Sequence, residues 1–318
     1  MKPSSYNQVV SDYKRYYLTW IINNICTNHC RYCPKYLHEG KNHHYEWSEA
    51  EYFIDQLLEH HPAVHLVVSG GEPTVSPFLP QLLKKFAGSH HYAGVSSNNV
   101  RRADYWQDLD VENLALSYHP EFQDDEWIAR AEATQQYVKQ TTVNLMMDPE
   151  HWQHCLETYD KMLNQATFSV IPTMIVDWGS GNTPVYTPEQ QQWFIDNPAV
   201  YRRLWTDPIL PRTFGILDKE GKPAIENRSW AVELINRREN NFALWECDIG
   251  IKSAFVQFDG SYRRGNCEQG GYAGWIREGF KPFDRGVICG YNECQCLTDI
   301  SIPKRRQNKP MWMIKKAL

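Results

Sequence analysis

Three cysteines near the N-terminal end of the sequence lie in one short loop. Cys26, Cys30 and Cys33 have the spacing C-x3-C-x2-C and follow a largely apolar run from Leu18 to Ile25. A loop of this length at the end of a strand brings three thiolates together, and thiolates are the usual ligands of iron–sulfur clusters. Three cysteines fill three corners of a [4Fe–4S] cluster and leave one iron open. The spacing therefore predicts a strand, a tight metal-binding loop and a cluster that can bind a further ligand.

Two other kinds of cysteine site, a structural zinc site and a disulfide framework, fit this spacing less well. Structural zinc sites prefer C-x2-C pairs with a second pair downstream, and this loop has no fourth ligand of its own. Disulfide frameworks suit short secreted chains. This sequence has 318 residues, and its first fourteen are polar, without the apolar segment of a signal peptide. We therefore expect a cytoplasmic protein, with zinc as the alternative metal.

A second motif follows the next predicted strand. Gly70, Gly71, Glu72 and Pro73 come directly after the apolar run 64–69. Together with the cysteine loop and the aromatic Tyr32 before its last cysteine, this pattern resembles the radical S-adenosylmethionine (SAM) enzymes. The resemblance implies that the open iron binds the amino and carboxylate groups of SAM. It also implies reductive cleavage of SAM to methionine and a 5'-deoxyadenosyl radical, which removes hydrogen from a substrate, and an electron donor such as flavodoxin or ferredoxin.

The same resemblance assigns candidate SAM contacts, which lie in the cysteine loop or where predicted strands end: Tyr32, Gly70, Gly71, Glu72, Asn98 and Ser117. It places the Gly-Gly-Glu segment at the methionine amino group, Ser117 near the ribose and carboxylate, and Tyr32 near the adenine. Asn98 fits more loosely, and an ordinary strand-end turn explains it equally well. His119 is a candidate catalytic residue that either faces the substrate or caps a strand before Pro120.

Strand and helix signals alternate through the first two-thirds of the chain. Strands are predicted at 16–22, 64–69, 92–96, 114–117, 143–146 and 168–176. Helices are predicted at 48–60, where Ser48 and Glu51 form a capping box, at 78–86, from Asp125 with Asp124 as N-cap, and from Pro149. This alternation predicts an α/β fold with a parallel sheet, whose functional residues gather at the carboxyl ends of the strands. The resemblance implies a partial (β/α)6 TIM-like barrel, although the pattern also allows a doubly wound sheet.

The remaining third of the chain contains a second group of cysteines: Cys247, Cys267, Cys289, Cys294 and Cys296. Asp259-Gly260 predicts a hairpin that brings the first two together, a second hairpin is predicted at 218–221, and a helix at 230–238. With Asn241, Phe242, Trp245, Arg264 to Cys267, Gly270, Gly271 and Asp299, the group resembles the twitch extension, a shortened SPASM domain.

A twitch extension implies one auxiliary [4Fe–4S] cluster in a small α+β domain made of a β-hairpin and a helix. Five cysteines exceed the four that one cluster needs, and two clusters would need eight. Cys247 and Cys267 are therefore predicted ligands, joined by two of Cys289, Cys294 and Cys296. The spare thiol is either a bystander or a hydrogen-atom donor. A zinc knuckle is the alternative to this auxiliary cluster. Cys155 is interpreted as a core residue of the helix after Pro149.

The predicted domains are an N-terminal extension at 1–15, the barrel at 16–197, the auxiliary-cluster domain at 198–304 and a basic tail at 305–318. Basic residues near this end are interpreted as a solvated terminus: Lys304 to Arg306, Lys309, Lys315 and Lys316. Residues expected to line the substrate cavity are Asn144, Met146, Thr173 and Asp177. Their types name no particular molecule.

Three functions fit these features. The first is oxidation of a small molecule, with the auxiliary cluster accepting the electron. The second is modification of a ribosomal peptide to a crosslink or epimer; only about fifteen residues precede the first predicted strand, so we expect no separate peptide-recognition domain before the barrel. The third is a zinc-stabilised binding protein without catalysis. The net charge of −5 argues against nucleic acid as its ligand, and no apolar run is long enough to span a membrane.

Overall fold

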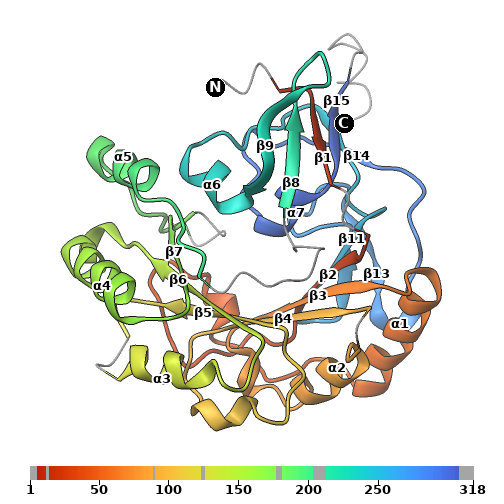
Figure 1. The fold of residues 1–318 in the computed structure, drawn as a ribbon. Coiled ribbons are helices and arrows are strands. Elements are labelled where there is room, and N and C mark those ends of the chain that lie inside the picture. The colour runs from red at the N-terminus through yellow and green to blue at the C-terminus, as the bar shows by residue number, and fades with distance from the viewer. Residues whose placement is uncertain are drawn as a thin grey trace. The chain divides into compact units, whose positions relative to one another are not determined.

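The computed structural model describes residues 6–11, 14–88, 90–122, 126–176, 181–202 and 213–307, and shows an α/β fold with a mixed sheet (Figure 1). The chain forms two compact units that are not continuous in sequence. Residues 20–47 and 65–206 form one, here called the parallel-sheet unit. Residues 1–19, 48–64 and 207–318 form the other, here called the terminal unit.

The parallel-sheet unit is built on adjacent parallel strands in chain order: β3 (Val64–Ser69), β4 (Tyr92–Ser97), β5 (Asn113–Tyr118), β6 (Gln140–Met146) and β7 (Ser169–Thr173). β2 (Tyr16–Ile21) precedes β3 in the sheet, and directly after β2 the Ile22 N–H donates to the Ser69 carbonyl at 2.9 Å. All but the last residue of β3 are buried, as expected for an apolar strand covered on both faces. The predicted parallel strands are confirmed.

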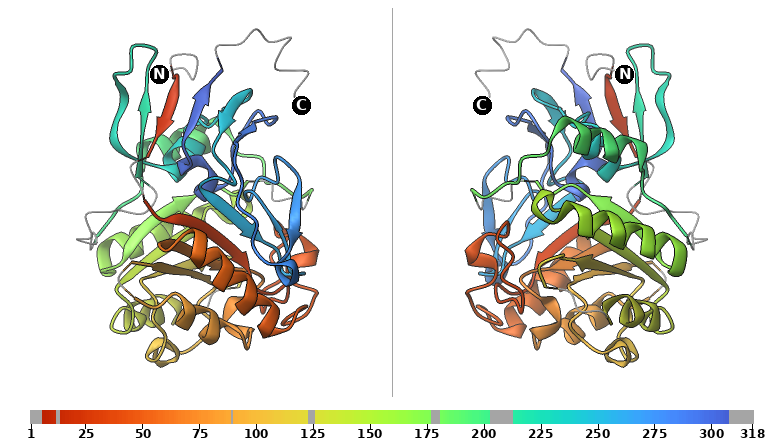
Figure 2. Two further views of the ribbon diagram at one scale, coloured as in Figure 1. Left: turned by 90° about the vertical axis from the view of Figure 1, so that its right-hand side faces the viewer. Right: turned by 90° about the vertical axis from the view of Figure 1, so that its left-hand side faces the viewer.

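Helices occupy the connections of this unit: α2 (Leu79–Lys85), α3 (Trp127–Thr134), α4 (Trp152–Gln165) and α5 (Pro188–Asp196) (Figures 1 and 2). Pro149 begins a 3-10 turn, η5 (Pro149–His151), which leads into α4. Cys155, Tyr159 and Met162 share the buried face of α4, so the core position predicted for Cys155 is confirmed. Asp124 and Asp125, predicted to begin α3, lie outside the described residues.

The terminal unit contains an antiparallel sheet in the order β14-β10-β15-β1-β8-β9. Its strands are β1 (Gln8–Val10), β8 (Thr213–Leu217), β9 (Pro223–Trp230), β10 (Trp245–Cys247), β14 (Val287–Ile288) and β15 (Lys304–Arg306). A second antiparallel ladder joins β11 (Ser253–Val256), β12 (Ser261–Arg263) and β13 (Tyr272–Trp275). Both predicted hairpins are present, β8–β9 and β11–β12.

The helices of the terminal unit are α6 (Ala231–Asn236), α7 (Leu297–Ser301) and α1 (Trp47–His60), of which only Trp47 is outside the unit. α1 buries the apolar face that its sequence predicts, through Phe53, Ile54 and Leu57. Phe53 packs against Tyr262 of β12, with ring centroids 5.0 Å apart. A segment far from β12 in sequence therefore contributes to the core of this unit.

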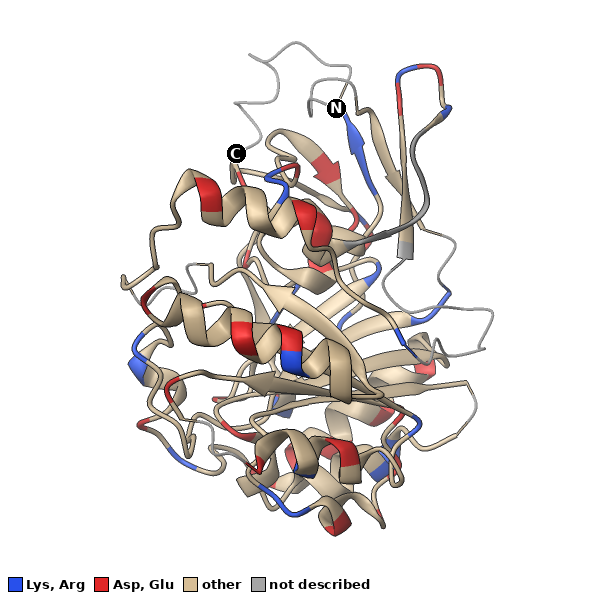
Figure 3. Ribbon diagram, turned by 60° about the vertical axis from the view of Figure 1, so that its left-hand side comes forward, with Lys and Arg blue, Asp and Glu red and all other residues tan. Residues whose placement is uncertain are grey.

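The structure differs from the sequence interpretation at Lys304 to Arg306. These residues form the strand β15 between β10 and β1, and the Lys304 side chain is buried. Strand pairing on both sides therefore replaces the solvated terminus expected there, while Lys309, Lys315 and Lys316 lie outside the described residues. Along the elements drawn in Figure 3, acidic and basic residues are interspersed. Within the described ranges, no helix is both long and apolar enough to cross a membrane.

Candidate functional site

The cysteine loop begins where β2 ends and packs directly against the segment that follows β3. The Gly71 N–H donates to the Asn23 carbonyl at 3.1 Å, and the Glu72 N–H donates to the Ile25 carbonyl at 2.8 Å. A Cβ at Gly71 would lie 2.1 Å from the Ile25 carbonyl oxygen, and one at Gly70 would lie 2.6 Å from Asn23 Oδ1. The two glycines are thus required for close approach of backbone to backbone, which brings the cysteine loop onto the end of the sheet.

The three cysteines of this loop are free thiols, and charge on Cys26 and Cys33 acts on Cys30. Cys30 is buried and clusters with Tyr32, Ile175 and Cys33, while Cys26 and Cys33 are partly buried. Burial raises the pKa of all three thiols, that of Cys33 to about 12, and charge on neighbouring groups adds to the effect. Thiols in this state are neutral at pH 7, so a metal that binds here must release their protons.

Glu72 links two loops through its carboxylate. The Glu72 side chain is buried and accepts hydrogen bonds from the Thr74 N–H at 3.1 Å, the Thr74 hydroxyl at 2.8 Å, the Ser97 hydroxyl at 3.0 Å and the Asn98 N–H at 2.8 Å. Burial raises the pKa of this carboxyl group, and the four hydrogen bonds oppose that rise. Glu72 therefore fixes the loop after β4 against the loop after β3.

Asn98 continues this chain of contacts to the cysteine loop. Its side-chain amide donates to the Thr27 hydroxyl at 2.7 Å and to the Cys26 sulfur at 3.8 Å. The Asn28 N–H also donates to the Cys26 sulfur, at 3.4 Å. N–H groups aimed at a thiolate stabilise its negative charge and tune the metal centre that it holds. The structure thus gives Asn98 a direct contact with the cysteine loop.

Tyr32 and His119 form a second contact between the loop and the sheet. The Tyr32 hydroxyl lies 2.7 Å from His119 Nδ1, and the Tyr32 ring is buried against Cys30 and Ile175. Burial lowers the pKa of His119 to about 4, so its imidazole is neutral at pH 7 and can exchange a hydrogen bond with the phenol. Ser117 lies in β5, two residues before His119, and is partly buried opposite Asn144 in the β5–β6 register.

Sequence reasoning missed a charged network centred on Arg31, which lies inside the cysteine loop. Its guanidinium pairs with Asp148, with Glu121 at 3.4 Å and with Glu150 at 3.0 Å, and the Asp148 carboxylate is fully buried. Asp148 and Glu121 follow β6 and β5, so the rule that functional residues follow parallel strands could have found them. The network ties the loop to the ends of two further strands.

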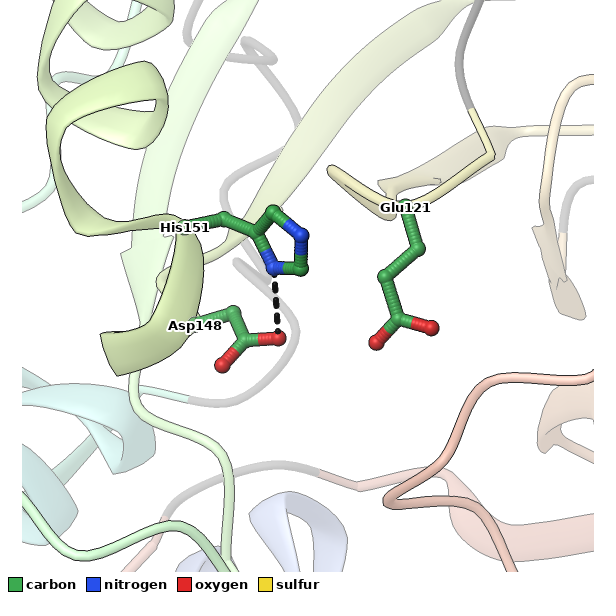
Figure 4. A group of neighbouring side chains, drawn as sticks. All are labelled: Glu121, Asp148 and His151. Atoms are coloured by element: carbon green, nitrogen blue, oxygen red, sulfur yellow. Dashed lines mark hydrogen bonds and ion pairs between the residues drawn. The ribbon is translucent and has the colours of Figure 1, made fainter.

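Figure 4 shows Glu121 and Asp148 with His151, whose Nδ1 lies 3.2 Å from an Asp148 oxygen. One ligand atom from each of the three lies within 4.8 Å of the others, a spacing that a metal ion could bridge. Arg31 already supplies a positive charge to both carboxylates. The simpler interpretation of this group is an ion-pair network that holds the loop. Of the expected cavity residues, Asn144, Met146 and Thr173 lie in β6 and β7, while Asp177 is outside the described residues.

The second cysteine group is assembled in the terminal unit from separate segments. Cys247 ends β10, Cys267 follows β12, Cys289 follows β14, and Cys296 is the N-cap residue of α7. The Cys294 backbone is held by Asn240, whose carbonyl accepts the Cys294 N–H and whose side-chain amide donates to the Cys294 carbonyl, both at 2.9 Å. All five are free thiols, and Cys267 packs against the cluster that contains Cys247.

Two buried charges lie among these cysteines. The Asp299 carboxylate accepts the Cys267 N–H at 2.7 Å, and the Lys304 ammonium donates to backbone carbonyls of α7 and its C-cap. Burial raises the pKa of every thiol in the group, that of Cys247 to about 11. The Lys304 charge opposes the rise at Cys247, Cys289 and Cys294. A group of five gathered thiols with no disulfide suits a metal–thiolate centre.

Comparison with known families gives one match along the sequence. Residues 20–119 match the radical SAM superfamily. The matched radical SAM segment begins in β2 and ends at His119, so it includes the cysteine loop, the Gly-Gly-Glu motif, Asn98 and Ser117. Glu121, Asp148 and the second cysteine group fall outside it. No curated protein matches the sequence significantly.

Solved structures with a similar fold include two with bound AdoMet or S-adenosylmethionine. A histidine-tagged form of anSMEcpe with bound AdoMet aligns at a TM-score of 0.50 and 14% identity, over 83% of this chain and 78% of that one. SuiB of Streptococcus suis bound to S-adenosylmethionine aligns at 0.53 and 13% identity, over 82% of this chain and 63% of that one. At these identities, the likeness concerns the fold.

Proposed function

We propose that this chain is a radical SAM enzyme that oxidises a small-molecule substrate. The observation that carries the proposal is a C-x3-C-x2-C loop with Cys26, Cys30 and Cys33 as free thiols, in the segment that matches the radical SAM superfamily. The nearest further cysteine in this unit, Cys155, is fully buried on α4 and donates toward the Met146 carbonyl. Three local thiolates fit a [4Fe–4S] cluster with an open iron better than a zinc site.

A cluster bound there would supply the electron that cleaves SAM into methionine and the 5'-deoxyadenosyl radical. The residues of this chain would bind and orient the reactants. We assign the backbone of Gly70 to Glu72 to the methionine end of SAM, Ser117 to its ribose and Tyr32 to its adenine. Glu72 accepts a hydrogen bond from the Asn98 N–H and so positions Asn98, which contacts the cysteine loop. His119 bonds to Tyr32 and thereby holds that ring.

The second cysteine group supports the oxidative part of the proposal. Four of its five thiols would hold one auxiliary [4Fe–4S] cluster in a twitch-like domain, where an electron from the substrate radical can be accepted. We accordingly keep a partial (β/α)6 barrel at 16–197 and an auxiliary domain at 198–304 as the proposed organisation. A reduced flavodoxin or ferredoxin in the cytoplasm would supply the first electron.

A peptide substrate is the second candidate, and two structural neighbours favour it. A structure of anSMEcpe contains AdoMet and a Kp18Cys peptide, with a TM-score of 0.50, 15% identity and 82% of this chain covered. SuiB has been solved bound to the precursor peptide SuiA, with a TM-score of 0.51, 13% identity and 79% of this chain covered. Both candidates use the same cysteine loop. They differ in which added compounds stimulate SAM cleavage: short peptides, or sugars, nucleosides and aminocyclitols.

The test is iron and sulfide content after anaerobic reconstitution, with SAM cleavage assayed under dithionite. Wild type should hold about eight irons and cleave SAM. The Cys26/Cys30/Cys33→Ala variant should hold about four irons and cleave none. Cys155→Ala is the matched control, because this buried cysteine lies outside both groups, and it should retain iron and activity.

Each departure from that result removes a defined part of the proposal. About four irons in wild type, with zinc at the second group, would end the electron-acceptor role and leave redox-neutral radical chemistry. Zinc with no iron would contradict the enzyme and favour a zinc-stabilised binding protein. Iron that persists in the triple variant would show that the first cysteine loop is not a ligand set.

A further inference from the structure

The Lys304 side chain is buried in the terminal unit, with 3% of its surface exposed. Lysines are almost never buried to this extent unless they are paired. The Lys304 ammonium donates to three backbone carbonyls, those of Asp299 at 2.7 Å, Ile300 at 2.8 Å and Ile302 at 2.9 Å. These contacts use all three donors of the group, and Nζ also lies 4.8 Å from the centre of the Phe242 ring. The geometry therefore suits a charged ammonium and not a neutral amine.

The hydrogen bonds satisfy the donors of Lys304 but do not neutralise its charge. Among the ion pairs of the described residues, none includes Lys304. The neighbouring Asp299 carboxylate is buried as well, and it is engaged by N–H groups of Asn266 and Cys267 instead. The hydrogen bond between Lys304 and Asp299 runs from the Lys304 ammonium to the backbone carbonyl of Asp299. The two charges still interact, because the Lys304 charge lowers the pKa of the Asp299 carboxyl group against the effect of burial. Asp299 therefore compensates part of the Lys304 charge, and thiolates formed on metal binding would add further negative charge beside the ammonium.

The charge of Lys304 also acts on three thiols of the second cysteine group. In the antiparallel pairing of β10 with β15, Lys304 lies directly opposite Cys247. The Lys304 charge also reaches Cys289 and Cys294, whose thiol pKa values it lowers against the effect of burial. Asp299 acts in the opposite direction, and its charge raises the pKa of Cys267 and Cys296. The Asp299 charge also raises the pKa of Cys247, Cys289 and Cys294, so the two buried charges act in opposite directions on those three thiols.

We propose that Lys304 is the charge-compensating residue of a metal–thiolate centre formed by the second cysteine group. This inference rests on the proposed auxiliary centre. A metal held by four thiolates carries net negative charge, which increases when an iron–sulfur cluster is reduced. A fixed positive charge beside it stabilises the bound metal and favours the reduced state, because net charge is one determinant of cluster potential. Lys304 acts through the field at the centre, as a positioning residue and not a catalytic one.

A purely structural role makes a different prediction. The three hydrogen bonds also tie β15 to the C-terminal end of α7, and any residue that keeps this link would then suffice. Lys304→Gln retains an amide donor without the charge, whereas Lys304→Arg retains the charge. Asp299→Asn removes the opposing charge and keeps a side chain of the same shape. These three variants separate electrostatics from packing.

The experiment uses the full chain reconstituted anaerobically, with the two clusters followed separately by electron paramagnetic resonance during a redox titration. We expect Lys304→Gln to shift the potential of the second cluster to more negative values, and to release its metal to a chelator several-fold faster. Lys304→Arg should stay close to wild type, and Asp299→Asn should shift the potential in the positive direction. The cluster of the first cysteine loop is the internal control and should not change in any variant.

An unchanged potential in a folded Lys304→Gln protein that still binds metal would overturn the inference. So would equal shifts in Lys304→Gln and Lys304→Arg. A wild type with zinc at the second group would contradict the auxiliary iron–sulfur cluster alone, because the rate of zinc release then tests Lys304 in the same way. A wild type with no metal at these cysteines would overturn both proposals.

Discussion

The two cysteine groups of this protein are built in different ways. The first consists of Cys26, Cys30 and Cys33, all within one eight-residue loop that leaves β2. The second draws its thiols from the ends of β10, β12 and β14 and from the start of α7. A local loop needs only the backbone contacts that hold it against the sheet, whereas the second group forms only when several strands have paired. Substitutions at the base of the loop should therefore disrupt the first group, and substitutions at strand contacts should disrupt the second.

The charges around the two groups differ as well. The first loop is held through Arg31, which is partly exposed and pairs with three carboxylates. The second encloses Lys304 and Asp299, both buried. Exposed ion pairs are screened by water and salt, whereas buried charges are screened much less. The Arg31 ion pairs should therefore orient the first loop, whereas the buried charges should alter how the second group binds metal.

The largest effect is expected for Gly71→Ala. Its Cβ would lie 2.1 Å from the Ile25 carbonyl oxygen and 2.5 Å from that of Leu37, so backbone must move. We expect a loss of about 3 kcal/mol in unfolding free energy and loss of the first metal centre, measured by urea unfolding and iron content. Gly94→Ala is the control, because the nearest atom to its Cβ is 3.6 Å away. Full iron content in Gly71→Ala would refute the role of this glycine.

Gly286→Ala makes the matching change in the terminal unit. Its Cβ would lie 2.4 Å from the carbonyl oxygen of Cys247, the residue that β14 faces on β10. We expect about 2–3 kcal/mol of destabilisation and selective loss of the second centre, measured by the same two methods. With Gly71→Ala, this variant tests whether the two groups are independent. Loss of both centres in either variant would show that they are not.

A smaller effect is expected for Asp148→Asn, which keeps the size of the side chain and removes its charge. Asp148 is fully buried beside Arg31, and Arg31 keeps Glu121 and Glu150 as partners. We therefore expect about 2 kcal/mol of destabilisation, below the usual penalty for breaking a buried pair. The first centre should lose iron faster and the second should not. Glu150→Gln, whose side chain is 67% exposed, should change stability by less than about 0.5 kcal/mol.

The smallest effect concerns pH. Burial lowers the pKa of His119 from 6.5 to about 4, so between these values the unfolded chain binds more protons than the folded one. Its contribution to stability is complete above pH 6.5 and falls as the pH drops toward 4. His119→Asn should reduce the loss of unfolding free energy between pH 7 and pH 5 by about 1–2 kcal/mol.

His61→Asn offers the same test in the terminal unit. Burial also lowers the pKa of His61 to about 4, and its ring stacks on Tyr16 at a centroid distance of 3.9 Å. Chemical denaturation at the two pH values measures both variants. Equal pH dependence in wild type and His119→Asn would contradict a neutral, partly buried imidazole beside Tyr32.

The sequence was sufficient wherever neighbours in the chain determine structure. The apolar pattern predicted both ends of β3 correctly and the ends of α1 to within one residue. Turn residues predicted the positions of both hairpins. The cysteine spacing and the Gly-Gly-Glu motif also indicated the matched radical SAM segment. Glu72 was expected at a ligand, yet its carboxylate is used by four hydrogen bonds to neighbouring loops. Two of these bonds come from Thr74 in the same loop, but the partners Ser97 and Asn98 are distant in sequence, so spacing alone does not reveal them.

What the sequence by itself determined is the set of strands and helices, and one loop whose three thiols cannot be far apart. Tertiary structure alone decided which distant residues meet. It placed Asp148 against Arg31, moved Lys304 from an expected tail into a strand where its side chain is buried, and joined α1 to the terminal unit. The physical reason is that backbone and apolar patterns act over a few residues, whereas burial and charge compensation depend on whichever segments the packed sheets bring together.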